Sequence, residues 1–126
     1  KSTLSALFAE RNYDILTDET AVVWIQEGNV YVSGTPWKGS ETDYYRNDIC
    51  KMEALYIIEH GKSNKLVALN VLDAINPILR QTFPHFWDKS CLYQLVNIVS
   101  KVLQIVPHYS YYFLPDSSAV EYIIQK

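Results

Sequence analysis

Apolar residues along the chain fall into short β-like runs that are separated by helical patterns. Six runs have the length and the β-branched or aromatic content of strands. They are residues 13–17 (YDILT), 21–26 (AVVWIQ), 30–33 (VYVS), 52–59 (MEALYIIE), 65–69 (KLVAL) and 108–114 (HYSYYFL). The second run is almost continuously apolar, which is typical of a strand covered on both faces. Because Gly28 sits in the short turn before the third run, the pattern predicts a β-hairpin over residues 21–33.

Four segments carry apolar residues at helical spacing. They are residues 2–11, 71–83, from 88 or 90 to about 106, and 117–125. Asn70, Asp88 or Ser90, and Asp116 precede three of them and are suitable N-caps. Pro77 should kink or divide the second helix, and Pro107 ends the third. Helices interleaved with strands indicate a single α/β domain over residues 1–126.

Composition and charge limit the partners and the cellular environment that we expect for this chain. The chain has 126 residues, 48% of them hydrophobic, which is enough for the core of one domain. No run of 18 or more apolar residues predicts a membrane span. The net charge of -3, with acids and bases interspersed, argues against nucleic acid and anionic membranes as partners. Cys50 and Cys91 lack metal-ligand spacing and are expected to be free thiols in a cytoplasmic protein, with a disulfide or redox pair as the alternative.

Aromatic side chains are numerous, with ten Tyr and three Trp. Tyr93, Tyr109, Tyr111 and Tyr112 are expected to pack the last strand and helix, and an acceptor-peptide surface is the alternative.

The first three residues, Lys1–Ser2–Thr3, stand directly before an apolar helix. In a phosphate-binding loop the backbone N–H groups at such a helix start wrap a phosphate, a lysine reaches the terminal phosphates, and a hydroxyl ligates Mg²⁺. The same letters are also common at an ordinary helix start. Asp18–Glu19, reached after one helix and one short strand, is where such folds hold the metal or place a base. A solvated turn is the alternative for this pair.

Residues 34–48 (GTPWKGSETDYYRND) form a long loop that is rich in Gly, Ser, Thr and Asp. Loops of this length inside a compact domain are often functional. Gly34 and Gly39 permit close approach of another backbone, while Trp37 and Lys38 offer a stacking face and a cation, and Arg46 follows. The loop is therefore either a substrate loop or a packed turn.

Together these strings resemble the HPr kinase/phosphorylase-like branch of P-loop proteins, which is related to phosphoenolpyruvate carboxykinase. The likeness rests on KSTLSALFAERNYDILTDETAVV and on GNVYVSGTPWKG, and it continues in looser form to the last helix. It implies a P-loop α/β fold with a mixed sheet flanked by helices. It also implies a kinase that uses ATP, or another phosphoryl donor, with Mg²⁺ to phosphorylate a serine of a small protein or peptide. A homo-oligomer is compatible with it.

The resemblance also implies roles for individual residues. Lys1 resembles the phosphate-contacting lysine, Ser2 the Mg²⁺-coordinating hydroxyl, and Thr3 a residue lining the phosphate site. Asp18 resembles the acid between metal and acceptor that can serve as the base, and Glu19 a second ligand of the metal or of its waters. Four residues would border the substrate pocket: Thr35, Trp37, Lys38 and Arg46.

The chain departs from the family pattern at its beginning. The glycines of the phosphate loop and the strand before them are not in the sequence, and the signature of true HPr kinases finds no close match. A sheet without its central parallel strand has unpaired edges and an open core. We therefore expect the 126 residues to be the C-terminal part of one P-loop kinase-like domain.

Two other functions stay open at this point. One alternative to the kinase is a regulatory module that binds nucleotide or phosphate without turnover. The other is a structural domain in which KST begins a helix by chance.

Overall fold

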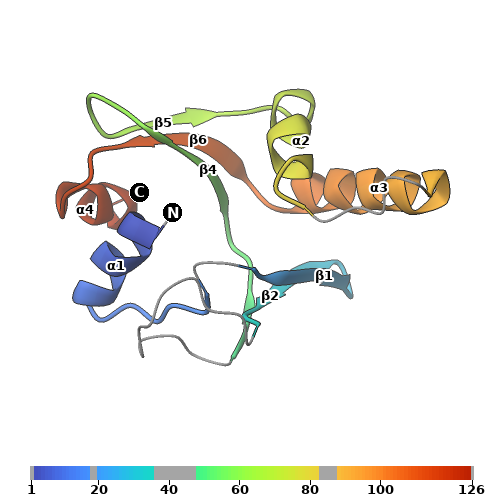
Figure 1. Ribbon diagram of the computed structural model, residues 1–126, viewed down its shortest axis with the longest axis horizontal. Helices are drawn as coiled ribbons and strands as arrows, with labels where there is room; N and C mark the ends of the chain where they lie inside the picture. Colours follow the sequence, from blue (N-terminus) through green and yellow to red (C-terminus); the bar gives the residue numbers. More distant parts are fainter. Residues whose placement is uncertain (1, 18–19, 36–47, 83–87, 126) are drawn as a thin grey trace.

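The computed structural model describes residues 2–17, 20–35, 48–82 and 88–125. Four helices and six strands lie within these ranges (Figure 1). In chain order they are α1 (Ser2–Glu10), β1 (Val22–Gln26), β2 (Asn29–Ser33), β3 (Ile49–Lys51), β4 (Leu55–His60), β5 (Lys65–Ala68), α2 (Val71–Leu79), α3 (Lys89–Ile105), β6 (His108–Phe113) and α4 (Ser118–Ile124).

The strands form two small sheets of three strands each, in the orders β1-β2-β3 and β4-β6-β5. In the second sheet β4 runs parallel to β6, with Leu55 opposite His108, while β5 runs antiparallel to β6. This second sheet is mixed, and the first is entirely antiparallel. The α/β class predicted from the sequence is confirmed, but the strands of the described ranges are divided between two sheets.

Helices cover both faces of the mixed sheet. Side chains alternate along β4, so neighbouring residues of this strand contact helices on opposite faces. Leu55 and Ile57 pack with α2 and α3 around buried Ala74. Tyr56 and Ile58 point to the opposite face and pack with α1, α4 and β6. Figure 1 shows the resulting layers, with α2 and α3 on one side of β4 and α1 and α4 on the other.

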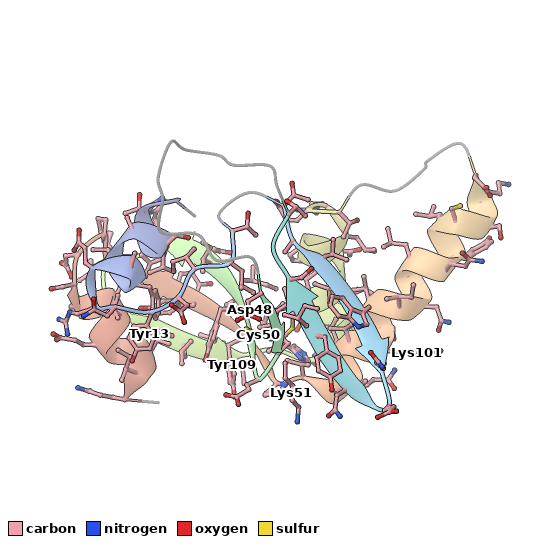
Figure 2. The ribbon with its side chains drawn as sticks, turned by 90° about the horizontal axis from the view of Figure 1, so that it is seen from below. Tyr13, Asp48, Cys50, Lys51, Lys101 and Tyr109 are labelled. Carbon is pink, nitrogen blue, oxygen red and sulfur yellow. The ribbon has the colours of Figure 1, made fainter. Side chains whose placement is uncertain are left out.

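The antiparallel sheet packs on the last turns of α3. Buried Val30 of β2 meets Val102 and Val106, with Ile25 beside them. In Figure 2, β3 with Cys50 and Lys51 lies between α1 and α3. The small sheet is therefore held on α3 through β2.

Tyr111 is the largest fully buried side chain of the core. Its hydroxyl donates a hydrogen bond of 2.6 Å to the Ala119 carbonyl oxygen, and its ring stacks on Tyr122. Burial raises the pKa of the Tyr111 phenol to about 12, and Tyr122 and Asp116 add to the rise. The prediction that this aromatic set packs the last strand and helix is right for Tyr111. It is wrong for Tyr93, whose side chain is 72% exposed on α3.

The helix caps follow the sequence predictions. The Asn70 side chain accepts from the Asp73 amide at 2.8 Å, and Asp88 accepts from the Ser90 amide at 2.9 Å. The Asp116 carboxylate accepts from the Ser118 amide at 2.9 Å, although Ser117 occupies the N-cap position. Pro77 lies inside α2 without dividing it. That helix ends at Leu79, earlier than the predicted residue 83, which lies outside the described residues.

Two strand predictions are wrong. Residues 13–17 form no strand, and only Ile15 makes an isolated bridge. The run in β1 is not covered on both faces, since Val22 and Val23 are 50% and 39% exposed. Among the described strands, β1 is an edge strand of a three-stranded sheet that packs on α3 through Val30 of β2. Its apolar content therefore does not reflect a central position.

Cys50 and Cys91 are both free thiols, as expected. The Asp88 carboxylate accepts a hydrogen bond from the Cys91 thiol, which raises the pKa of that thiol. Within the described ranges, no helix combines the length and the hydropathy that crossing a bilayer requires.

Candidate functional site

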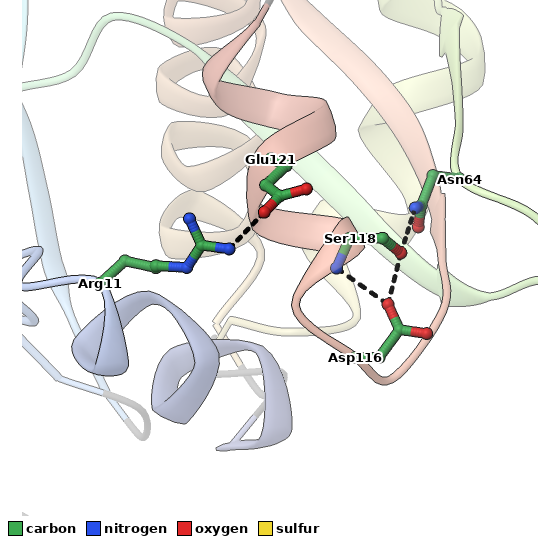
Figure 3. A network of polar contacts seen from close by, with 5 residues as sticks. All are labelled: Arg11, Asn64, Asp116, Ser118 and Glu121. Atoms are coloured by element: carbon green, nitrogen blue, oxygen red, sulfur yellow. Dashed lines mark hydrogen bonds and ion pairs between the residues drawn. The ribbon is translucent and has the colours of Figure 1, made fainter.

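Helix α1, which begins at the KST motif, is fixed on the core. Leu4 packs against the cluster of Tyr111 and Phe113. At the other end of the helix, Arg11 forms an ion pair with Glu121 of α4 (Figure 3). Asn12 adopts a positive φ of 64°, the left-handed conformation in which helices commonly end. The start of α1 thus has a defined place in the fold.

Figure 3 also shows the hydrogen bonds that hold the start of α4, the helix against which α1 packs. Asn64 donates to the Ser118 hydroxyl at 2.8 Å and accepts from the Leu114 amide at 2.9 Å. The Asp116 carboxylate accepts from both the amide and the hydroxyl of Ser118. These bonds tie the β4–β5 turn to the start of α4.

A cavity of about 360 Å³ lies beside α1. Its lining comes from α1, from the segment that precedes Asp18, from Ala21, from β2 and from β4. The residues are Leu4, Ser5, Phe8, Asp14, Ile15, Leu16, Thr17, Ala21, Val32 and Ile58. The helix that begins with KST and the segment that leads into the acidic pair therefore share one cavity.

The start of the GTPWKG segment lies against the same region. The Thr35 hydroxyl donates a hydrogen bond of 2.7 Å to the Thr20 carbonyl oxygen. A Cβ added to Gly34 would lie 2.4 Å from the Leu16 carbonyl oxygen, so only glycine allows this approach. Contacts on both sides of residues 18–19 thus hold the loop start against the segment that carries the acidic pair.

The structure describes three of the predicted site residues in part. Ser2 begins α1, Thr3 is exposed in the first turn of that helix, and Thr35 is anchored on Thr20. The other predicted site residues lie outside the described ranges: Lys1, Asp18, Glu19, Trp37, Lys38 and Arg46. Their predicted roles stay predictions.

Sequence reasoning missed the two backbone carbonyl groups against which the loop start lies, those of Leu16 and Thr20. A backbone carbonyl has no signature in a sequence. Gly34 was the one residue whose type indicated a close contact in this region. A glycine at the end of a strand often marks the close approach of another backbone, but it does not identify that backbone.

The described residues contain no group of three or more His, Cys, Asp or Glu side chains that could hold a metal ion. The predicted donor set of Ser2, Asp18 and Glu19 consists of hydroxyl and carboxylate oxygens. These are hard ligands of the kind that Mg²⁺ prefers. The chemistry of the set therefore fits Mg²⁺.

The contact between Gly34 and Leu16 leads to a testable prediction. Gly34→Val should lower the free energy of unfolding by about 1–3 kcal/mol, because the added side chain forces two backbone segments apart. Gly28→Asn is the matched control, since no atom lies within 4 Å of a Cβ there and asparagine tolerates its positive φ. Urea denaturation of both variants measures the difference. Equal losses would show that the approach of Gly34 to Leu16 is not tight.

Comparisons with protein-family models, with curated proteins and with solved structures find no match for this chain.

Proposed function

We propose that the protein is a nucleotide-dependent kinase that phosphorylates a serine hydroxyl of a peptide or small protein, with Mg-ATP as donor. The observation that supports this most directly is the pair of contacts that Gly34 and Thr35 make with Leu16 and Thr20. These contacts bring the loop start close to the segment of the acidic pair, and α1 lines the same cavity. Three described segments that lie apart in the sequence, namely α1, the residues before position 18 and the start of the loop at Gly34, thereby lie in one region.

The start of α1 is suited to holding phosphate. The first turn of a helix presents backbone N–H groups without intrahelical partners, and its dipole favours an anion. The first turn of α1 contains no acidic residue that would oppose this. In the proposal Lys1 adds a cation and Thr3 lines the phosphate site.

Ser2, Asp18 and Glu19 would hold the metal through oxygen ligands. When bound, Mg²⁺ supplies the positive charge that offsets the negative charge on the phosphate oxygens. The residues of this chain would set the ligand types, and the Thr35–Thr20 hydrogen bond holds the loop start on the residue that follows Glu19 in the sequence.

Asp18 is proposed to accept the proton of the serine hydroxyl. A base must lie within hydrogen-bond reach of the group that it deprotonates. The loop that begins at Gly34 is then the natural border of the acceptor site, with Trp37, Lys38 and Arg46 as contacts for the peptide.

Lys1→Ala tests the nucleotide site in the full-length protein. Loss of a charge-assisted contact to phosphate should weaken Mg-ATP binding about tenfold or more. Lys62→Ala is the matched control, because Lys62 lies in the turn between β4 and β5. Isothermal titration with Mg-ATP gives both dissociation constants. Unchanged affinity in Lys1→Ala would favour a chance helix start over a phosphate site.

A further inference from the structure

Strand β1 is an edge of its sheet among the described strands. The strand orders β1-β2-β3 and β4-β6-β5 leave β1, β3, β4 and β5 with one described neighbour each. In Figure 2, β1 lies on the side of β2 that faces away from Cys50 and Lys51 of β3. Val22 and Val23 of β1 are 50% and 39% exposed. Such an edge presents backbone N–H and C=O groups to which a further strand can bond.

The charges on these four edge strands distinguish β1 from the others. Lys51 lies in β3, Glu59 in β4 and Lys65 in β5, whereas β1 (VVWIQ) contains neither a charged residue nor a proline. Charged side chains and proline are the devices by which edge strands usually resist pairing with another chain. Like charges directly opposite each other also destabilise a strand pair. β1 lacks this protection and opposes no like charges when it meets a copy of itself.

The turn after β1 determines which of its backbone groups face outwards. Glu27 and Gly28 connect β1 to β2, and both have a positive φ, 53° and 78°. Two such residues form a type I′ hairpin turn, in which the flanking residues Gln26 and Asn29 make a hydrogen-bonded pair. Hydrogen-bonded pairs then alternate along the strand. Trp24 therefore directs its N–H and C=O groups to β2, as Gln26 does.

Val23 and Ile25 lie between these positions, so their N–H and C=O groups point to the free edge. The side chains of both residues lie on the α3 side of the sheet. Ile25 packs against the cluster of Val30 and the last turns of α3. Val23 lines a cavity of about 480 Å³ between β1, α2 and α3, together with exposed Ile98 of α3. The edge thus combines outward hydrogen-bonding groups with apolar side chains that are covered only in part.

We propose that β1 pairs with β1 of a second copy of this chain, antiparallel and about a two-fold axis at Trp24. Val23 of one copy exchanges both backbone hydrogen bonds with the partner's Ile25, and Ile25 does the same with the partner's Val23. Trp24 lies opposite the partner's Trp24 as a non-hydrogen-bonded pair, which agrees with the direction of its backbone groups toward β2. The two three-stranded sheets become one continuous sheet. This inference concerns assembly and does not depend on the kinase proposal.

Pairing removes the same apolar surface from water in both copies. The partner's Ile25 covers the open side of Val23, and the two-fold symmetry repeats this contact in the other copy. Aromatic pairs across neighbouring strands stabilise a sheet further. Trp24 already stacks on Tyr31 of β2, so in the dimer Trp24 and Tyr31 of each copy form one row of rings across the joined sheet.

Sedimentation velocity over a range of concentrations tests whether this edge self-associates. Val23→Lys places a charge at the edge, and that charge loses hydration when the edge is paired. Val67→Lys is the matched control, because Val67 is 36% exposed on β5, an edge strand that already carries Lys65. Thermal unfolding verifies that both variants fold.

The wild type and Val67→Lys should form dimers, and Val23→Lys should weaken the self-association about tenfold or more. A wild type that stays monomeric would overturn the inference. So would a dimer that Val23→Lys leaves as stable as in the wild type, because the contact would then lie elsewhere.

A disulfide tests the register of the two strands. Trp24→Cys is made in a background without the native thiols, with Cys50→Ser and Cys91→Ser. The Cα atoms of an opposite non-hydrogen-bonded pair are about 4.5 Å apart, a distance that a disulfide spans. Mild oxidation should therefore link two copies of Trp24→Cys. Tyr31→Cys is the control, because it removes the other ring of the same stack from β2, one strand further from the partner. Equal linking of the two variants, or none in Trp24→Cys, would contradict pairing at Trp24.

Discussion

Asp18→Asn is expected to reduce phosphoryl transfer to a serine peptide by about 10²–10⁴-fold, the usual contribution of a positioned general base. Asparagine keeps the size of the side chain but cannot accept the serine proton. Because Lys1, Ser2, Glu19 and the first turn of α1 are unchanged, the variant should still bind Mg-nucleotide, although more weakly, since one carboxylate ligand of the metal becomes a neutral amide. Single-turnover transfer and Mg-ATP titration on the full-length protein separate the two effects.

Asp73→Asn is the control for this experiment, since Asp73 lies in the first turn of α2 and lines neither cavity. It makes the same chemical change and should leave transfer unaffected. Undiminished turnover in Asp18→Asn would remove Asp18 from the mechanism.

Phe113→Ala should lower the free energy of unfolding by about 3–5 kcal/mol, the typical cost of truncating a buried aromatic side chain. Phe113 is 2% exposed and shares a cluster with Tyr111, Ala119 and Leu4 of α1. Its loss leaves a cavity under the helix that begins at the KST motif. The substitution should therefore weaken nucleotide binding as well as lower the free energy of unfolding.

Tyr93→Ala is the matched control, because an aromatic ring that is 72% exposed contributes little to the core. Its free energy of unfolding should change by no more than about 0.5 kcal/mol. Urea denaturation measures both variants. Similar losses in the two would contradict the packing of β6 against α1 and α4.

Features that depend on local sequence were predictable. The caps at Asn70 and Asp88 use side chains that bond their own helix start. The runs that became β4 and β6 were recognisable from their length and from their β-branched or aromatic residues.

Features that depend on distant partners were not predictable. Residues in β1 have the same apolar character as those in β4, yet Val23 lines an open cavity and Trp24 stacks on Tyr31 of the neighbouring strand. A continuous apolar run does not distinguish a covered strand from the wall of a cavity. The division into two sheets follows from pairings between strands that lie far apart in the sequence.

The candidate site shows the same limit. The sequence marked Gly34 as a point of close approach and Asp18–Glu19 as an acidic pair, but it gave no distance between them. The structure shows that Gly34 lies close to the Leu16 carbonyl group and that Thr35 donates to the Thr20 carbonyl group, two contacts with residues that precede and follow the pair in the sequence. The apolar cavity between β1, α2 and α3 had no counterpart in the sequence patterns, because its walls come from four separate elements.

Transfer of phosphate to serine is the most direct test of the central claim. The full-length protein is incubated with γ-labelled ATP, Mg²⁺ and a serine peptide, and the products are analysed by mass spectrometry. We predict a phosphoserine peptide that forms with Mg²⁺ and is absent when EDTA is added. Binding of Mg-ATP without any phosphopeptide would contradict the kinase proposal and favour a regulatory nucleotide-binding module instead.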